Sequence, residues 1–430
     1  MNAEVRIIKT PAEQGLADAY ASAKGKLPGK GAVASLRDEA FHHFEAQGLP
    51  HRRVEEWKYT DLRALMREAL PLATLGGKPA QAKTPFDGIK GRRLVFIDGA
   101  FEPKQSDLSA ENGVTISTLA QALAKGDALV TSHLGKVFET KDPAVALNTA
   151  LMGDGAVIRI AAGTKLAQPI VLVFTGSQAA SVFTRSLVIV EAGAQVTLVE
   201  IHETDGAQVN TALELVVEDK ARIDHVKITQ AKAQHLSTLM ARVGAEAKFN
   251  TFTLTADSAL VRNQMFLRFA GDDTEAAIGG VTLLHDKQHV DSTLVIQHAS
   301  ECCTSRERFR SVLDGASRAV FQGKIIVEPG AQQTDAKMVS NALLLSDEAE
   351  ADNKPELEIF ADDVQCGHGA TAGALDEQLL FYLRARGIPR KEAEALMIQA
   401  FVGEIIETVS DEQLRDVLMD RALAWLGTRA

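Results

Sequence analysis

A heptapeptide that returns along the chain constrains the fold more than any other feature. I-V-E-A-G-A-Q begins at Ile189, and I-V-E-P-G-A-Q begins at Ile326, 137 residues later. Between these copies the alanine after the turn recurs at intervals of 27 and 26 residues, at Ala194, Ala221 and Ala247. The two copies therefore stand close to five such steps apart. A fixed period in this range indicates a solenoid, in which each repeat stacks on the next.

Each repeat consists of short apolar runs joined by small turns. From about Gly155 to Ala372 these runs alternate as strands do, with Val196, Leu198 and Glu200 on one face. No helix-length segment interrupts the repeats, so βαβ units do not fit. We expect a mainly β fold, a right-handed parallel β-helix whose small turn residues suit tight corners. A β-sandwich or barrel is the alternative, but it leaves the period unexplained.

Helical patterns precede and follow the repeats. Thr10 with Glu13 and Ser410 with Gln413 have the pattern of capping boxes, and Asp376 is placed to cap a further helix. The open ends of a β-helix need cover against edge-to-edge aggregation, and we expect the flanking helices to provide it. The chain is thus expected to have three domains: a mainly helical N-terminal domain (1–150), the β-helix core (151–374) and a C-terminal helical domain (375–430).

Composition narrows the class of protein. A chain of 430 residues exceeds what one hydrophobic core supports, and its net charge of −11 comes from interspersed acids and bases. This charge argues against nucleic acid or an anionic membrane as the main partner. Three cysteines cannot build a disulfide framework, and no apolar run reaches the roughly 18 residues of a membrane span. The first ten residues lack the apolar core of a signal peptide, so we expect a cytoplasmic protein.

The chemically most suggestive segment is A-D-D-V-Q-C-G-H-G-A-T, residues 361–371. Because successive side chains of a strand alternate between faces, Cys366 and His368 are expected to point the same way, together with Asp362 and Val364. A thiolate and an imidazole are suitable ligands for iron, but two ligands cannot complete a four-coordinate iron centre. On the motif alone, a buried cysteine beside a hydrogen-bonded histidine is the better interpretation.

This segment resembles the C-terminal motif D-D-V-x-C-S-H-G-A-T of the SufB/SufD family of iron-sulfur cluster assembly proteins. The likeness continues through residues 373–388, and H-R-R-V-E-E-W-K-Y-T, residues 51–60, resembles the N-terminal R-x-x-E-x-W-K-Y-T element of the family. We expect Trp57 in this element to act as a packing clasp against the neighbouring domain. The sequence H-G-A-T at His368 favours the SufD branch, because SufB-like chains tend to carry H-E-A-T. Gly367 departs from the serine that the family often has.

The resemblance implies a scaffold rather than an enzyme. It implies a chain that pairs with SufB through the β-helix, binds the ATPase SufC through its C-terminal domain, and helps to build and transfer nascent iron-sulfur clusters. Cys366 and His368 would contact a transient cluster at the SufB interface, with no catalytic residue and no stably bound cofactor. A homodimer is compatible with the resemblance when the chain is isolated. Candidates for the SufC contact lie on one helical stripe: Met397, Phe401 and Ile405.

Other chemical candidates are weaker. Cys302 and Cys303 are adjacent, so a strand would point them to opposite faces, and burial is the better interpretation. The chain has no G-x-x-x-x-G-K-[ST] phosphate loop, no dinucleotide-binding G-x-G-x-x-G after a strand and no G-x-S-x-G elbow. A metal site in one histidine-rich segment has little support: His285, His289, Asp291 and His298.

The alternative function is that of a β-helix enzyme acting on polysaccharide. Such an enzyme needs a groove with paired carboxylates and with aromatic side chains that stack on sugars, and it is usually exported. Aromatic residues make up only 5% of this chain, which disfavours that function. A zinc hydrolase is a third hypothesis, but its usual three protein ligands are not visible at any recognised spacing.

Overall fold

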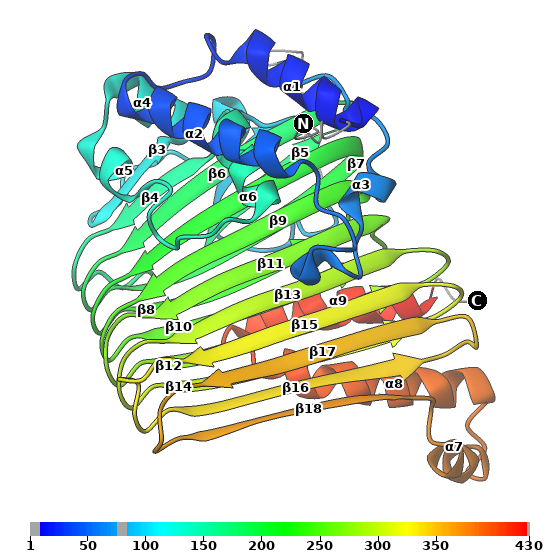
Figure 1. Ribbon diagram of the computed structural model, residues 1–430. Coiled ribbons are helices and arrows are strands. Elements are labelled where there is room, and N and C mark those ends of the chain that lie inside the picture. Colours follow the sequence, from blue (N-terminus) through cyan, green and yellow to red (C-terminus); the bar gives the residue numbers. More distant parts are fainter. Residues whose placement is uncertain (1–8, 75–83, 177, 428–430) are drawn as a thin grey trace, which may run out of the picture.

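The computed structural model describes residues 9–74, 84–176 and 178–427. Its body is a stack of long strands that cross the molecule in coil after coil, with one group of helices over the first coils and another behind the later coils (Figure 1). The strands form two sheets, here named sheet A and sheet B, and from β5 onward they alternate between them. The prediction of a mainly β, parallel β-helix flanked by N-terminal and C-terminal helices is therefore confirmed.

The strands divide between the two sheets, and the long strand β7 contributes to both. Sheet A contains β3 (Val114–Thr118), β4 (Ala156–Ile160), β6 (Ser181–Val190), the second part of β7 (Gln195–Val217), β9 (Lys232–Val243), β11 (Leu260–Phe269), β13 (His289–His298), β15 (Arg318–Val327) and β17 (Glu350–Ile359). Sheet B contains β1 (Arg92–Ile97), β2 (Ala100–Phe101), β5 (Ile170–Gly176), the first part of β7, β8 (Arg222–Thr229), β10 (Lys248–Ala256), β12 (Glu275–Leu284), β14 (Thr304–Leu313), β16 (Asp335–Leu344) and β18 (Gln365–Gly373).

Equivalent residues of consecutive coils stack directly on one another. On sheet B, Ser305 of β14 lies opposite Ala336 of β16, which lies opposite Cys366 of β18. The inward-facing side chains of both sheets form one continuous apolar cluster along the solenoid. The repeated alanines Ala194 and Ala221 belong to this cluster and are at most 1% exposed, because the next coil lies directly beneath each corner. The period in the sequence is thus the length of one coil.

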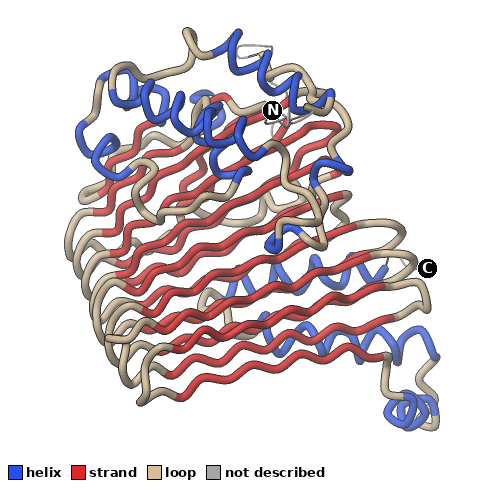
Figure 2. The backbone as a smooth tube through the Cα atoms, viewed as in Figure 1, coloured by secondary structure: helices blue, strands red, loops and turns tan. Residues whose placement is uncertain are grey.

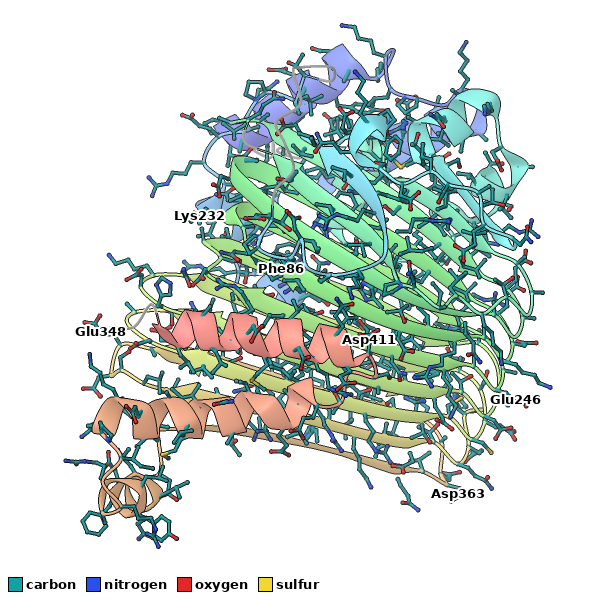
Figure 3. All side chains as sticks on the ribbon, turned by 180° about the vertical axis from the view of Figure 1, so that it is seen from behind. Phe86, Lys232, Glu246, Glu348, Asp363 and Asp411 are labelled. Carbon is teal, nitrogen blue, oxygen red and sulfur yellow. The ribbon has the colours of Figure 1, made fainter. Side chains whose placement is uncertain are left out.

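One corner of the solenoid is built from residues in the left-handed backbone region, among them Glu246 with a φ of 54°. The Glu246 amide donates to the carbonyl of Asp272 on the next coil at 2.8 Å, and the Gln333 amide donates in the same way to Asp363 at 2.6 Å. Glu246 and Asp363 lie along one edge of the molecule (Figure 3). Hydrogen bonds between coils therefore continue through the turns.

Strands are also present within the N-terminal region. β1 pairs in parallel with β5 and antiparallel with β2, and β3 pairs antiparallel with β4. Residues 92–118 therefore extend both sheets to positions before residue 151, where the core was expected to begin. The three domain boundaries stay a prediction.

The N-terminal helices cover the outer face of sheet A at its first coils (Figure 2). α6 packs on β6 and β7, and α2 packs on α6. The predicted capping box is confirmed, since the Glu13 amide donates to the Thr10 hydroxyl at 3.2 Å and the Thr10 amide donates to the Glu13 carboxylate at 2.6 Å. The elements of this region are α1 (Pro11–Ala23), α2 (Ala32–Gln47), η1 (Glu55–Trp57), α3 (Leu62–Leu65), η2 (Pro103–Gln105), α4 (Leu119–Lys125), α5 (Ala128–His133) and α6 (Pro143–Leu151).

The C-terminal group consists of α7 (Glu377–Arg384), α8 (Arg390–Ile406) and α9 (Glu412–Gly427). α8 and α9 lie across the outer face of sheet B (Figure 3). The expectation that these helices cover the open end of the β-helix is wrong. They lie on the face because their apolar side chains, Trp425 among them, pack against the outward side chains Phe252 and Val281.

The caps of these helices agree with the sequence pattern in one case and depart from it in another. Asp376 caps α7 as predicted, accepting from the amides of Gln378 and Leu379. α9 is capped by Asp411, whose carboxylate accepts from the Leu414 amide at 2.9 Å. The predicted capping box of Ser410 with Gln413 is therefore wrong, and the Ser410 hydroxyl is turned toward sheet B instead.

Candidate functional site

The last coil of the solenoid consists of β17 and β18 (Figure 1). Within the described ranges, β17 pairs only with β15 and β18 pairs only with β16, so each strand presents a free outer edge. Near this edge Ile359 is 40% exposed and Phe360 is 62% exposed. An unpaired strand edge beside exposed apolar side chains is a template for pairing with another chain.

Cys366 and His368 lie on β18, in this last coil, as the sequence predicted. The parallel register places Cys366 opposite Ala336 and His368 opposite Met338, two fully buried residues of the interior cluster. Both side chains therefore continue the inward-facing columns of sheet B past the point where the coils end. Asp362, which the alternation argument placed on the same face, lies in the turn before β18 and is exposed, because the strand begins only at Gln365.

The two side chains differ in their surroundings. Cys366 is half-buried and packs with Val364 against the interior cluster, and this burial raises the pKa of its thiol. The thiol therefore stays protonated at neutral pH, and the thiolate forms only when a ligand favours it. His368 is exposed, with no further coil above it. The pair thus combines a shielded sulfur with an open imidazole at the end of the solenoid.

A buried acid lies deeper in the same column. Glu307 of β14 is opposite Met338, so it stands two coils below His368, and it is 0% exposed. Burial raises the pKa of Glu307 to about 7, while the nearby Ser305 hydroxyl acts in the opposite direction. That hydroxyl is close to Glu307 but is not aligned for a hydrogen bond, and neither carboxyl oxygen has a hydrogen-bond partner among the described residues.

Ser305 is directed toward a second buried polar group. Its hydroxyl lies 3.1 Å from Nε2 of His298, an inward-facing residue of β13 that stacks on Phe269. Burial lowers the pKa of His298 to about 3, so the imidazole is neutral at any physiological pH. Sequence reasoning overlooked Glu307 and grouped His298 with histidines that face the other way.

The described part of the chain contains no group of three or more histidine, cysteine, aspartate or glutamate side chains placed to hold a metal ion. Cys366 and His368 are thus two potential ligands without a third from the same chain. A metal or cluster bound there would need further ligands from sulfide or from a second chain, which the free strand edges beside the pair could bring close.

The remaining cysteines occupy a corner of the solenoid. Cys303 is buried in the interior cluster and donates to the carbonyl of Gly271 at 3.4 Å, which agrees with the expected burial. Cys302 is at the corner, partly exposed, with its thiol donating to the Gln333 side chain at 3.2 Å. The expected burial is therefore wrong for Cys302, because this residue lies in the turn before β14 and not in a strand.

The histidine-rich segment of β13 serves to hold the N-terminal region. Asp291 is fully buried and forms an ion pair with Arg262, and its carboxylate accepts a hydrogen bond at 2.5 Å from the hydroxyl of Thr60. Nε2 of His289 lies 2.9 Å from the same hydroxyl. The weak metal hypothesis for this segment is therefore wrong, because a guanidinium already occupies the space next to the carboxylate.

Trp57 completes this contact and acts as the expected clasp. Its ring is 0% exposed, the Arg262 guanidinium lies 3.9 Å from the ring centroid, and the indole nitrogen donates to Asp142 at 2.9 Å. The R-x-x-E-x-W-K-Y-T element thus fixes the N-terminal helices to the outer face of sheet A by a buried cation–π and ion-pair arrangement.

The three residues that the sequence suggested for a partner contact on the C-terminal helices differ in how exposed they are. Ile405 is 3% exposed and packs against sheet B, so its placement on a partner surface is corrected. Phe401 is half-buried beneath the guanidinium of Arg310, and Met397 is half-buried. The exposed apolar side chains lie instead mainly on α7, which projects from the body of the molecule (Figure 1): Leu379, Phe381 and Tyr382.

None of the helices in the described ranges is long and apolar enough to cross a membrane.

Comparison with known proteins identifies related chains. A family model described as "SUF system FeS cluster assembly, SufBD core domain" matches residues 173–401, and one described as "SufBD protein N-terminal region" matches residues 12–172. The first match includes Cys366 and His368. Together the two matches cover most of the chain.

Three relatives illustrate the similarity. An iron-sulfur cluster assembly SufBD family protein of Synechocystis sp. is 31% identical over 382 residues, 84% of each chain. The iron-sulfur cluster assembly protein SufD of Escherichia coli is 28% identical over 384 residues, 87% of this chain and 88% of that protein. The protein of that name in Bacillus subtilis is 24% identical over 404 residues, 90% of this chain and 92% of its own.

Proposed function

The chain belongs to the SufBD family of iron-sulfur cluster assembly proteins, and from this membership we propose that it is the SufD-type scaffold subunit of a SUF assembly complex. In this proposal it pairs with a SufB-type chain and with the ATPase SufC to build and transfer nascent clusters. It contributes binding surfaces and ligands, while ATP hydrolysis belongs to SufC. Relatives named SufD support the choice of branch.

The observation that carries this proposal is the form of the last coil. Cys366 and His368 end their columns of inward-facing side chains beside free strand edges, where a second chain can add strands. Pairing there would place ligands of the partner next to the thiol and the imidazole. Iron and sulfide are cargo in this scheme, bound transiently because two ligands from one chain do not form a closed site.

The proposed SufC contact is the exposed surface of α7. Phe381 is 73% exposed, Tyr382 is 51% exposed and Leu379 is 46% exposed, because α7 projects from the body of the molecule. Aromatic side chains of this kind are the usual anchors of protein interfaces. The guanidinium of Arg386 lies 3.4 Å from the Tyr382 ring centroid and gives the patch a positive rim.

The proposal replaces the alternative of a polysaccharide-acting enzyme. Membership of an assembly family gives no support to that alternative, and the inward face of the last coil offers a thiol and an imidazole where a glycosidase would need paired carboxylates.

The decisive experiment uses a strain in which the SUF route is the only source of clusters and the native SufD gene is deleted. We expect this chain to restore the activity of cluster-dependent enzymes and to co-purify with SufB, SufC, iron and acid-labile sulfide. A chain that neither restores activity nor retains SufB would refute the proposal. Expression of the folded chain, checked by circular dichroism, is the control.

A further inference from the structure

The interior of the solenoid contains a polar section in its middle coils. The strand register gives two columns of inward-facing residues that face each other across this section. The column of sheet B consists of Glu200, Lys227, Thr253, Gly280 and Phe309. The column of sheet A consists of Thr211, Ser237, Asn263, Ser292 and Phe321. Both columns lie in coils that precede the last coil, so an inference about them does not rest on the proposed function.

The two columns enclose a cavity of about 30 Å³, which is room for about two water molecules. Apolar side chains form part of its wall: Leu239, Met265, Leu294 and Phe309. Toward the last coil, the columns end at the rings of Phe309 and Phe321, whose centroids lie 4.9 Å apart. The Phe309 ring also fills the space beside Gly280, where a Cβ atom would lie 2.4 Å from it. These rings lie between the cavity and the strand that carries Cys366 and His368.

Lys227 brings a positive charge to this cavity. Its side chain is 6% exposed and crosses the interior from sheet B to sheet A. The ammonium donates to the Ser237 hydroxyl at 2.8 Å and to the side-chain oxygen of Asn263 at 2.7 Å. Both acceptors are neutral, and no carboxylate in the described ranges forms an ion pair with Lys227. Since an ammonium has three N–H donors, one of them remains for a further acceptor.

The buried ammonium is charged at neutral pH. Burial lowers the pKa of Lys227 to about 8, while the charge of Glu200 acts in the opposite direction. A charge inside a protein is costly unless an opposite charge and hydrogen bonds compensate it. The two neutral acceptors supply hydrogen bonds but no opposite charge.

Glu200 lies opposite Lys227 in the strand register, but its carboxylate is engaged elsewhere. It contacts Nε2 of His225 at 3.1 Å and Nε2 of His202 at 3.5 Å. Burial acts to raise the pKa of Glu200, but these two contacts hold it below its ordinary value. The Lys227 side chain extends away from Glu200, toward Asn263 on the following coil. The lysine therefore lacks a counter-ion of its own on the side of the cavity.

Hydroxyl groups line the cavity beyond the ammonium. Thr253 follows Lys227 in the column of sheet B, and Ser292 follows Asn263 in the column of sheet A. Neither hydroxyl makes a hydrogen bond with another residue of the described ranges. The Ser237 hydroxyl accepts from Lys227, so its own hydrogen is available to a ligand. The cavity thus offers one cation and several hydrogen-bond donors within apolar walls.

This combination determines the class of ligand. A cation with surrounding donors matches an anion, because hydrogen bonds to a charged acceptor are stronger than those to a neutral one. One uncompensated cation matches a single negative charge, and the small volume restricts the ligand to a few atoms. We propose that the cavity binds one monovalent anion of the size of chloride on the ammonium of Lys227, with the hydroxyls of Ser237, Thr253 and Ser292 as further donors.

The first test locates the anion. The full chain is refolded from urea in sodium bromide and crystallised from the same salt, because the anomalous scattering of bromide identifies its position and refolding gives it access to the interior. We expect one bromide inside the cavity, in contact with the Lys227 ammonium. Bromide on the outer surface alone, with water in the cavity, would overturn the proposal.

The second test measures binding in solution. The midpoint of urea unfolding is followed as sodium chloride replaces sodium gluconate at constant ionic strength, so that the screening of surface charges does not change. Gluconate is too large for the cavity. Since an anion bound only by the folded chain stabilises it by mass action, we expect the midpoint to rise with the chloride concentration. A midpoint that does not depend on chloride would contradict the proposal.

Variants connect the chloride dependence to the cavity. Lys227→Met keeps a long side chain without the charge and is expected to abolish the dependence. Lys248→Met removes an exposed ammonium that pairs with Glu275 at 2.8 Å, and is expected to leave the dependence intact. Ser292→Ala retains the lysine and should raise the chloride concentration needed for the same shift several-fold, which keeps the test valid if Lys227→Met does not fold. An equal chloride dependence in all variants would mean a general salt effect and would overturn the proposal. Circular dichroism of each variant controls for folding.

Discussion

His368 stands directly over Met338 in the parallel register of β18 on β16, in a column of side chains that begins inside the solenoid and ends in the open. Met338 is 0% exposed, whereas His368 is exposed because no coil follows it. Equivalent positions of two successive coils thus hold a side chain that packs in the core, Met338, and an exposed imidazole, His368. This relationship allows the structural and the functional contributions of the column to be tested separately.

His368→Ala is expected to abolish or strongly reduce cluster assembly while changing the free energy of unfolding by less than about 0.5 kcal/mol, as for other exposed sites. Met338→Ala, one coil deeper, is expected to destabilise the chain by about 2–5 kcal/mol because it leaves a cavity. Urea denaturation measures the free energy of unfolding, and the activity of cluster-dependent enzymes in the deletion strain measures cluster assembly. Full activity of His368→Ala would remove this residue from the proposed site. Cys366→Ser is expected to have a smaller effect on activity.

The free edge of the last coil predicts a subunit interface. Phe360→Asp is expected to weaken pairing, with itself or with a SufB chain, at least tenfold, because the new charge must lose its water without gaining a partner. Leu108→Asp, at a residue 53% exposed elsewhere on the molecule, is the matched control. Size-exclusion chromatography with light scattering gives the assembly state. Unchanged pairing of the Phe360 variant would place the interface on another surface. Val364 is unsuitable for this test, since it packs against the interior cluster.

The exposed patch on α7 predicts where the ATPase binds. Phe381→Ala with Tyr382→Ala is expected to weaken SufC binding by more than tenfold, as the loss of central aromatic anchors commonly does. Leu423→Ala on α9, at a residue 39% exposed, should have no effect. A pull-down with purified SufC measures both variants, and equal retention of SufC would reject α7 as the contact. Deletion of residues 376–430 is a poorer test, because it would uncover the apolar outer face of sheet B.

Much of the fold could be predicted because each coil repeats the one before it. The return of Ala194 and Ala221 at equal positions fixes the length of a coil, and the alternation within strands fixes which face is buried. The position of α8 could not be predicted in this way. Its apolar stripe, which includes Ile405, indicates that a surface is covered but contains no information on whether this surface is a sheet face, a solenoid end or another protein.

The candidate site was predictable only where a strand was present. Alternation correctly placed Cys366 and His368 on one face, but it failed for Asp362, since β18 begins after that residue. Glu307 was overlooked although the sequence contained a signal for it. Arg306 and Arg308 flank it, and arginines at alternate positions of a strand mark the outward face, so the residue between them must point inward.

Glu307 predicts an unusual dependence of stability on pH. Its pKa in the folded chain is about 7, above the ordinary value of 4.5, so between these pH values the folded state holds a proton that the unfolded state has lost. The contribution of Glu307 to the free energy of unfolding is therefore fully present below about pH 4.5. It falls as the pH rises to about 7 and stays low above that pH. The full difference is on the order of 3 kcal/mol.

Glu307→Gln keeps the neutral form at every pH and should remove this dependence. The variant is expected to match the original chain near pH 4.5 and to be more stable by up to about 3 kcal/mol at pH 8, because it never buries an unpaired charge. Urea denaturation at both pH values provides the measurement. Ile160→Ala, at a fully buried residue in the first coils of the solenoid, is the control variant whose deficit does not change with pH. An equal difference between Glu307→Gln and the original chain at the two pH values would show that this carboxyl is not titrating inside the solenoid.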